Sequence, residues 1–561
     1  MENKLMKLQT AIIPLLLIST SLCFSGSRAK NPEPQKAKFI LDMVHHNPGE
    51  ARYKSVYDNP AVIKEMGYNG KVFFLFDSPL LAINWESVDP EILPKGSPDR
   101  AWVDAKAAAI HKTFSACKKL DLSVFAMSDL ILFPKRLLEK EGLGDDFGDP
   151  NNPKIQKLLR AQIDEMFKQF PEFDGLVVRI GETYLQDAPF HKGSILNKKN
   201  PEKTIIPLIQ LLREEICVKR NKQLIFRTWG SFDRDAKVYQ KVSDAIEPHA
   251  NLTISIKHCE GDFHRANPFS KVIGMGRHKQ IIEVQCAREY EGKGAYPNYI
   301  AHGVIEGFEE YENMPEEKIN SIREFTETKP ELFAGIWTWT RGGGWRGPYI
   351  TNEMWCDLNA WVMAQWANDT TQSEESLCYR YATERLHLQE KDLIAFRKLC
   401  LLSADAVIRG RNTVQGDMNP WWTRDQGIAW PKIKNYPACK ERLLAQKDES
   451  IKMWKEILAL TQSIQWADQK TCEYAIGSAY YGLDLYIIYR AVINLAVAEK
   501  EKDTEAMKKW IKAYDQAWAE YEQLPAQYPQ LATLYTQEYN LHVNPAKFKV
   551  DALRKKLGLT K

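Results

Sequence analysis

The sequence predicts a (β/α)8 barrel followed by an all-α domain. Between residues 38 and 340, short apolar runs of β-rich composition recur eight times, and stretches with helical periodicity lie between most of them. After residue 350 the strand signals end and long helical patterns follow. Eight strand and helix units within about 300 residues are typical of a closed parallel barrel.

The predicted strands are rich in Val, Ile, Leu and Phe and do not alternate apolar with polar residues, which is the pattern of strands buried on both faces. In chain order they cover residues 39–45, 71–76, 122–127, 175–180, 223–229, 252–257, 280–286 and 332–339. Amphipathic patterns predict helices between them, over 104–120, 155–169, 204–218 and 234–245.

The second part of the chain is predicted to be helical throughout. Its periodic segments cover residues 352–367, 374–386, 391–407, 440–465, 473–499 and 503–522. Residues 411–437, which contain Pro-bearing turns and the pair Trp421-Trp422, are expected to form a long loop. We therefore expect residues 30–350 to form the barrel and residues 351–561 to form an α-helical domain packed against it, with a homodimer formed through this domain as a further expectation.

Residues 1–29 have the composition of an export signal, because Lys4 and Lys7 precede a short apolar run over 11–22 and small residues follow it. The run is too short to span a bilayer, and no later uninterrupted apolar run of the sequence reaches the length that a span needs. We expect a periplasmic or secreted protein without a membrane span. A lipid anchor on Cys23 is the less favoured alternative.

The composition excludes several classes of function. The net charge is +3, and the first 29 residues hold three basic residues and one acidic residue, so the remainder carries +1. A near-neutral chain lacks the basic surface that nucleic-acid binding needs. Apart from Cys23 the cysteines are scattered without CxxC spacing, so we expect buried thiols. Motifs for nucleotide binding, serine hydrolases and zinc hydrolases are absent, and we expect no cofactor and no metal.

Polar or aromatic residues follow nearly every predicted strand, at the barrel mouth where functional groups gather. Carboxylates and tryptophans around one cleft suit glycoside hydrolysis, in which one carboxylic acid protonates the departing oxygen and another carboxylate activates water or attacks the sugar. A second interpretation stays open, in which the Arg and Lys residues at these strand ends only neutralise buried carboxylates. The residues at these strand ends are His45, His46, Asp77, Asp129, Glu182, Arg227, Trp229, Lys257, Asp262, Glu289, Trp337, Trp339 and Arg341.

Several segments, in one shared register, resemble family 67 of the glycoside hydrolases, the α-glucuronidases. The similarity covers roughly residues 170–370. The segments are Asp174-Gly-Leu-Val-Val-Arg-Ile-Gly-Glu182, Gln223-Leu-Ile-Phe-Arg-Thr-Trp229, Lys257-His-Cys-Glu-Gly-Asp-Phe263 and Ile282-Glu-Val-Gln-Cys-Ala-Arg-Glu-Tyr290, followed by the tryptophan-rich stretch 337–366.

The resemblance implies an inverting mechanism with Glu182 as the general acid. Asp262 and Glu289 would position and activate water. The same resemblance implies that Arg227 and Lys257, together with Arg179, bind the carboxylate of a uronic acid, and an arginine fork suits a carboxylate on general grounds.

The chain departs from the family pattern in two places. Residues 183–187 follow Glu182 where the family has a Gly- and Pro-rich turn, so Asp187 is a competing candidate for the acid. The family's N-terminal domain has no counterpart before the first predicted strand, which indicates a distant branch.

Three further residues are expected to contact substrate. Trp229 ends the fifth strand, His45 ends the first, and Trp345 lies in a Gly-rich loop after the last strand. A metal site at His258, Asp262 and His264 is disfavoured because the spacing lacks a helical or hairpin context.

Taken together, the residues predict an exported, exo-acting glycoside hydrolase that removes a uronic acid from oligosaccharides derived from polysaccharides. The alternatives are a barrel glycosidase that acts on another sugar, a non-catalytic carbohydrate-binding protein, and a polysaccharide lyase with Tyr184 as its base.

Overall fold

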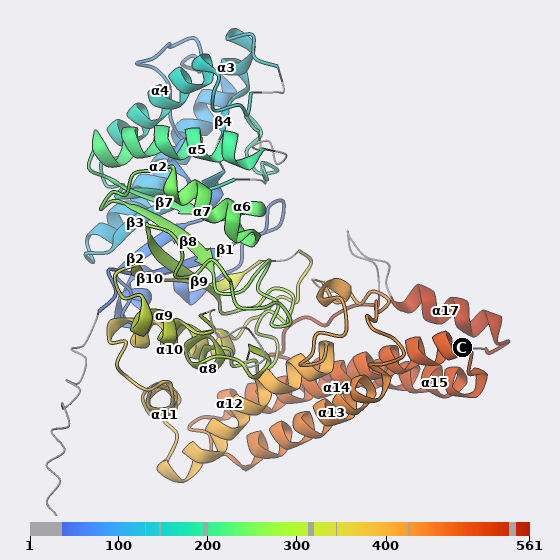
Figure 1. Cartoon of the computed structure of the whole chain (residues 1–561). Helices are drawn as coiled ribbons and strands as arrows, with labels where there is room; N and C mark the ends of the chain where they lie inside the picture. The colour runs from blue at the N-terminus through green and yellow to red at the C-terminus, as the bar shows by residue number, and fades with distance from the viewer. Residues whose placement is uncertain are drawn as a thin grey trace, which may run out of the picture.

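The computed structural model describes residues 36–129, 131–144, 147–180, 182, 184–194, 200–311, 319–343, 345–424, 427–537 and 546–560. The predicted export signal, residues 1–29, lies outside these ranges. The described chain forms a closed eight-stranded barrel and a helical region that extends from one side of it (Figure 1). The predicted fold class is therefore confirmed.

The eight barrel strands are parallel and neighbour one another in chain order, and the pairing of the first with the last closes the barrel. Two of them, the first and the sixth, have the bounds that the apolar runs predict. The eight barrel strands are β1 (Phe39–His45), β2 (Gly70–Phe73), β3 (Ser123–Asp129), β5 (Gly175–Arg179), β7 (Gln223–Arg227), β8 (Leu252–Lys257), β9 (Lys279–Gln285) and β10 (Phe333–Gly342).

Two additional strands were not predicted, because each has only three residues. They are β4 (Leu132–Pro134) and β6 (His191–Gly193), which form a separate antiparallel pair.

Helices cover the outside of the barrel, and several begin at caps that the sequence encodes. In α2 the side chain of Ser97 accepts a hydrogen bond from the backbone N–H of Arg100 and Pro98 occupies the first turn, an arrangement typical of helix starts. The helices are α1 (Pro60–Glu65), α2 (Pro98–Lys118), α3 (Lys135–Lys140), α4 (Pro153–Gln169), α5 (Pro201–Leu212), α6 (Ser231–Arg234), α7 (Ala236–Asp244), α8 (Ala301–Glu306), α9 (Ile322–Thr328) and α10 (Met354–Asn368).

A long loop takes the place of a helix between β8 and β9. Residues 258–278 are described in full and contain no helix. In a barrel, such a loop lies over the mouth at the carboxyl ends of the strands. This loop carries Asp262, one of the predicted catalytic residues.

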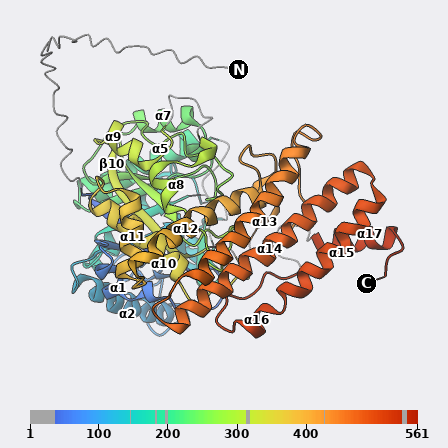
Figure 2. The same ribbon diagram turned by 90° about the horizontal axis from the view of Figure 1, so that it is seen from below.

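The C-terminal region is built from long helices that pack against one another in sequence, with α12 to α15 running side by side (Figure 2). Its longest helix, α14, is apolar and long enough to cross a membrane by length and composition, but 78% of its most apolar window is buried inside the molecule. The helices are α11 (Glu374–Glu384), α12 (Glu390–Arg411), α13 (Lys440–Ser463), α14 (Gln469–Glu501), α15 (Thr504–Tyr521), α16 (Leu524–Gln527) and α17 (Ala546–Lys556).

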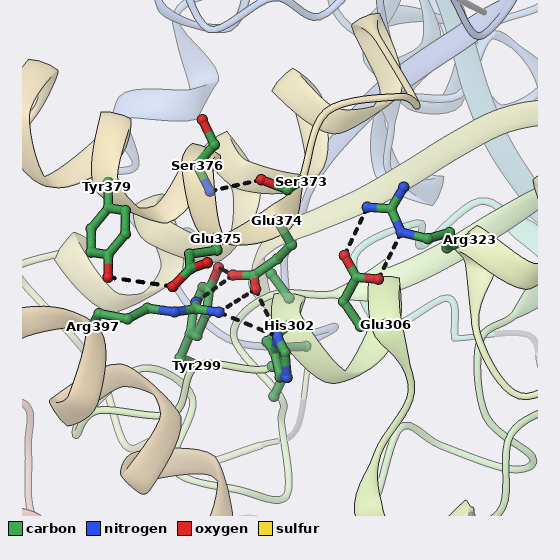
Figure 3. A network of polar contacts seen from close by, with 12 residues as sticks. Tyr299, His302, Glu306, Arg323, Ser373, Glu374, Glu375, Ser376, Tyr379 and Arg397 are labelled. Atoms are coloured by element: carbon green, nitrogen blue, oxygen red, sulfur yellow. Dashed lines mark hydrogen bonds and ion pairs between the residues drawn. The ribbon is translucent and has the colours of Figure 1, made fainter. Parts of the chain in front are cut away.

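A buried polar network joins the two regions (Figure 3). Glu374 of α11 accepts hydrogen bonds from Arg397 of α12 at 2.6 and 2.5 Å, lies 2.7 Å from Nδ1 of His302 on α8, and accepts one from the Tyr299 hydroxyl. Burial alone would raise the pKa of Glu374, but the bonds from His302 and Arg397 outweigh it and hold the pKa at about 2. Glu374 is therefore ionised at neutral pH and ties the helical region to the barrel.

Candidate active site

A cavity that opens to solvent lies at the carboxyl ends of the barrel strands. Eight of the nine predicted site residues line it, and the ninth, Lys257, is bonded to one of the eight. The lining residues are His45, Asn47, Pro48, Arg179, Glu182, Tyr184, Arg227, Trp229, Asp262, Phe263, Glu289, Tyr290, Trp339, Trp345 and Arg424.

The three predicted cations come from the last residues of three neighbouring strands, β5, β7 and β8. Parallel strands of a barrel end at the same mouth, so the side chains of Arg179, Arg227 and Lys257 are brought close together. All three are buried, with relative exposures of 4%, 1% and 2%. Buried cations need partners, and the structure supplies one for each of them.

Each cation is paired with a carboxylate. Arg179 binds both oxygens of Asp129, at 2.6 and 2.7 Å, and Nε of Arg227 lies 2.8 Å from both oxygens of Glu283. Nζ of Lys257 lies 2.8 Å from Oδ1 of Asp262. Charge pairing inside the barrel is therefore a fact of this site, and any role in substrate binding comes in addition to it.

Glu182 follows β5 and its side chain is about one third exposed, so it is open to the cavity. Arg179 holds it from behind, because Nη1 lies 3.5 Å from Oε2 of Glu182 and Nη2 donates to its backbone carbonyl at 3.3 Å. Burial, and then the charge and hydrogen bond of Glu182, raise the pKa of Tyr184 well above its usual value. Arg179 thus orients Glu182, while Tyr184 stays protonated beside it.

Asp262 is ionised at neutral pH. Burial raises its pKa, but the charge and hydrogen bond of Lys257, with smaller contributions from His264 and Arg227, outweigh this and lower the pKa to about 2. Lys257 also lies over the ring of Trp229, 4.4 Å from its centroid. A carboxylate held in this state suits the binding and activation of water and does not suit proton donation.

Glu289 is positioned by the ends of β9 and β10. Its backbone N–H donates to the side-chain oxygen of Gln285 at 2.7 Å. Gly343, just after β10, has a φ of +81°, and a Cβ at that position would lie 2.4 Å from Oε2 of Glu289. The glycine therefore leaves the space that the carboxylate occupies.

Aromatic rings form the remaining walls. His45 stacks on Trp339 at 5.2 Å and meets the edge of Phe74 at 4.2 Å. Burial, and then the charges of nearby cations such as Arg179, hold the pKa of His45 well below its usual value, so the imidazole is neutral. Trp345 donates from Nε1 to the carbonyl of Pro48 at 3.2 Å, which fixes its ring at the cavity.

Some expectations of the sequence do not lead to this cavity. Asp187, the competing acid, is not among the lining residues and accepts a hydrogen bond from the N–H of Gly49. His258 is buried behind the site, and His264 stacks on Tyr290. Across the part of the chain that is described, no group of three or more His, Cys, Asp and Glu side chains is placed to hold a metal ion.

The sequence analysis missed Arg424, which reaches the cavity from the loop between α12 and α13. This loop belongs to the helical region and contacts the barrel loops at Tyr290 and His264, through Trp421 and Arg424. The local signal was the aromatic pair Trp421-Trp422 within a predicted loop. Nothing in that pattern indicates which part of the barrel the loop meets.

No known family model matches the chain, and no curated protein matches its sequence. Solved structures do match it. A GH138 enzyme described as targeting pectin rhamnogalacturonan II aligns with 93% of this chain and 68% of its own, at a TM-score of 0.58 and 13% identity. The alignment with CpGH84D covers 93% of this chain and 74% of that one, at a TM-score of 0.40 and 12% identity. The alignment with an O-GlcNAc hydrolase mutant of Thermobaculum terrenum covers 93% of this chain and 94% of that one, at a TM-score of 0.37 and 9% identity. The chain thus shares its overall fold with the GH138 enzyme.

Proposed function

We propose that this protein is an exo-acting glycoside hydrolase that removes a terminal uronic acid, most simply an α-linked glucuronic acid, from oligosaccharides derived from polysaccharides. One observation carries the proposal: Glu182, Asp262 and Glu289 line one cavity together with Arg227 and three tryptophans. Export to the periplasm or to the outside is part of the proposal and rests on the sequence of residues 1–29 alone.

The proposed chemistry is a single displacement with inversion. Glu182 gives its proton to the glycosidic oxygen while the bond from that oxygen to the anomeric carbon breaks. A water held by Asp262 and Glu289 attacks the anomeric carbon from the opposite face and loses its proton to one of these two carboxylates. The ionised state of Asp262 supports this division of roles, since the acid must carry a proton and the base must not.

The uronic acid is proposed to bind at Arg227 and Lys257. Both are buried, where water competes weakly for a bound carboxylate; Arg227 lines the cavity, and Lys257 reaches it through its bond to Asp262. Arg179 contributes less to this binding than the sequence suggested, because three of its nitrogens already interact with Asp129 and Glu182. Trp229 and Trp345 offer flat faces for the sugar rings of the substrate.

Lyase chemistry is the less favoured alternative. It needs a base that removes a proton next to the uronate carboxyl, and Tyr184 is held in its protonated form by burial and by Glu182. A purely binding protein would not need three carboxylates in one cavity. A barrel glycosidase that acts on another sugar remains the nearest competing function.

The test is to incubate the protein with aldouronic acids and with pectic and algal oligosaccharides, and to identify the released sugar. The GH138 match makes pectic fragments a natural part of this panel. The proposal expects a free uronic acid, with the opposite anomeric configuration in the first product seen by NMR. An unsaturated product that absorbs in the ultraviolet would favour the lyase, and release of a neutral sugar would favour the other glycosidase. Preparations of the Asp262→Asn variant serve as the inactive control.

A further inference from the structure

The loop between α12 and α13 places a fourth cation on the wall of the cavity. The guanidinium of Arg424 lies over the rings of Tyr290 and Trp421, 4.9 and 5.1 Å from their centroids, and Nη2 donates to the Tyr290 hydroxyl at 2.9 Å. Tyr290 is itself packed by His264, which stacks on it at 4.8 Å. The side chain is therefore held in one position by aromatic neighbours from both regions of the protein.

Arg424 differs from the other cations in depth. Arg227 and Lys257 have side chains that are 2% exposed and end barrel strands, whereas Arg424 is half-buried and comes from a loop over the mouth. In an exo-acting cavity the terminal sugar occupies the closed end. The sugar that leaves therefore lies toward the opening, where Arg424 is found.

Arg424 lines the same cavity as Tyr184 and Trp345. Burial and Glu182 raise the pKa of Tyr184, and the charge of Arg424 acts on the same hydroxyl in the opposite direction. Tyr184 also meets the edge of Trp345, with 5.4 Å between their ring centroids. A general acid stands next to the oxygen of the leaving group, so Tyr184 and Trp345, which lie near Glu182, face the leaving sugar, and Arg424 reaches the same cavity from the loop over the mouth.

From this arrangement we infer that Arg424 forms a subsite for a negatively charged leaving group, so that the substrate carries a second acidic sugar next to the uronic acid that is removed. A half-buried guanidinium held by aromatic rings binds a carboxylate with little loss of side-chain freedom. Trp345 supplies the stacking surface for the same sugar. This inference rests on the proposed function and deepens it, because it names the chemical class of the leaving group.

The experiment compares three synthetic disaccharides that share the same terminal uronic acid. The second unit is a uronic acid, its methyl ester, or a neutral hexose. The protein is tested unchanged and as Arg424→Gln and Arg424→Lys. Arg380→Gln is the matched control, because Arg380 lies on α11 outside the cavity and its guanidinium bonds to Glu384 on the same helix.

The unchanged protein should prefer the charged second unit to its methyl ester by about tenfold or more in kcat/KM. Arg424→Gln should lower kcat/KM about 10- to 100-fold on the charged substrate and less than about threefold on the other two, since only the charged unit loses an ion pair. Arg424→Lys should retain part of the preference, because the charge is kept and the fork is lost. Arg380→Gln should change none of the three.

Equal losses on all three substrates would place Arg424 against the terminal uronic acid or in a structural role, and would overturn the subsite. The same holds if the unchanged protein turns over all three equally well. If no substrate releases a uronic acid, the proposed function fails and the subsite fails with it. That outcome is distinct from turnover that ignores the second charge.

Discussion

The strongest test of the substrate class removes Arg227 from the cavity without leaving a buried charge behind. Arg227 and Glu283 are 2% and 0% exposed, and Ser255 donates to the same carboxylate at 2.9 Å. Replacing Arg227 alone would leave the buried carboxylate of Glu283 without its partner cation, and breaking a buried ion pair in this way costs about 3–5 kcal/mol of stability. The informative variant is therefore Arg227→Met combined with Glu283→Gln, in which both charges are removed together.

The expected effect follows from the position of the guanidinium. Arg227 lies 4.7 Å from the centroid of Trp339 at the base of the cavity, where a bound uronate would be desolvated. Losing a desolvated ion pair of this kind costs about 2–4 kcal/mol in transition-state binding. This corresponds to a decrease of about 30- to 1000-fold in kcat/KM for a glucuronide. The matching neutral glucoside should change by less than about threefold.

The assay measures kcat/KM for both substrates with the unchanged protein, the double variant and Glu283→Gln alone. The single variant controls for the loss of the carboxylate, and thermal unfolding of all three shows whether the barrel is intact. Equal losses on the charged and the neutral substrate would refute the reasoning. A preference of the unchanged protein for the glucoside would refute it as well, and would leave a barrel glycosidase without a uronate site.

Three further predictions concern single residues. Glu182→Gln should abolish turnover of natural glycans but spare much of the activity on a substrate with an activated phenol, which needs little protonation; equal losses in steady-state assays would contradict its role as the acid. Lys257→Met should raise the pKa of Asp262 above its present value of about 2, so the acidic limb of the pH profile should move to higher pH, whereas Lys257→Arg should leave it nearly unchanged. The depressed pKa of Glu374 stabilises the fold above about pH 4.5, and this stability is lost as the pH falls toward 2. Glu374→Gln should therefore lower the free energy of unfolding at pH 7 by about 3 kcal/mol and make the melting temperature less dependent on acid pH. An unchanged melting temperature would show that the network does not join the two regions.

The local pattern of the chain was sufficient to predict the barrel. Each strand is buried on both faces, so its composition alone distinguishes it from an amphipathic helix. The order of the strands followed because neighbouring units of a parallel barrel are consecutive in the chain. The predicted homodimer and the boundary at residue 350 stay predictions.

The candidate site was predictable where it depends on strand ends and not elsewhere. Glu182, Asp262 and Glu289 lie within five residues of the ends of β5, β8 and β9, so their position at the mouth was implied by the fold. The pairing of Arg227 with Glu283 was one of several combinations that the sequence allowed. The place of Arg424 was not predictable, because its loop is separated from Tyr290 by more than a hundred residues.

The sequence by itself thus determined the eight barrel strands, the long helices and most of the charged groups at the barrel mouth, since these depend on periodicity and composition over short stretches. Only the tertiary structure decided which cation neutralises which carboxylate and which distant loop closes the cavity. The physical reason is that these contacts join segments far apart in the chain, and their geometry is set by the packing of the whole molecule and not by local conformational preference.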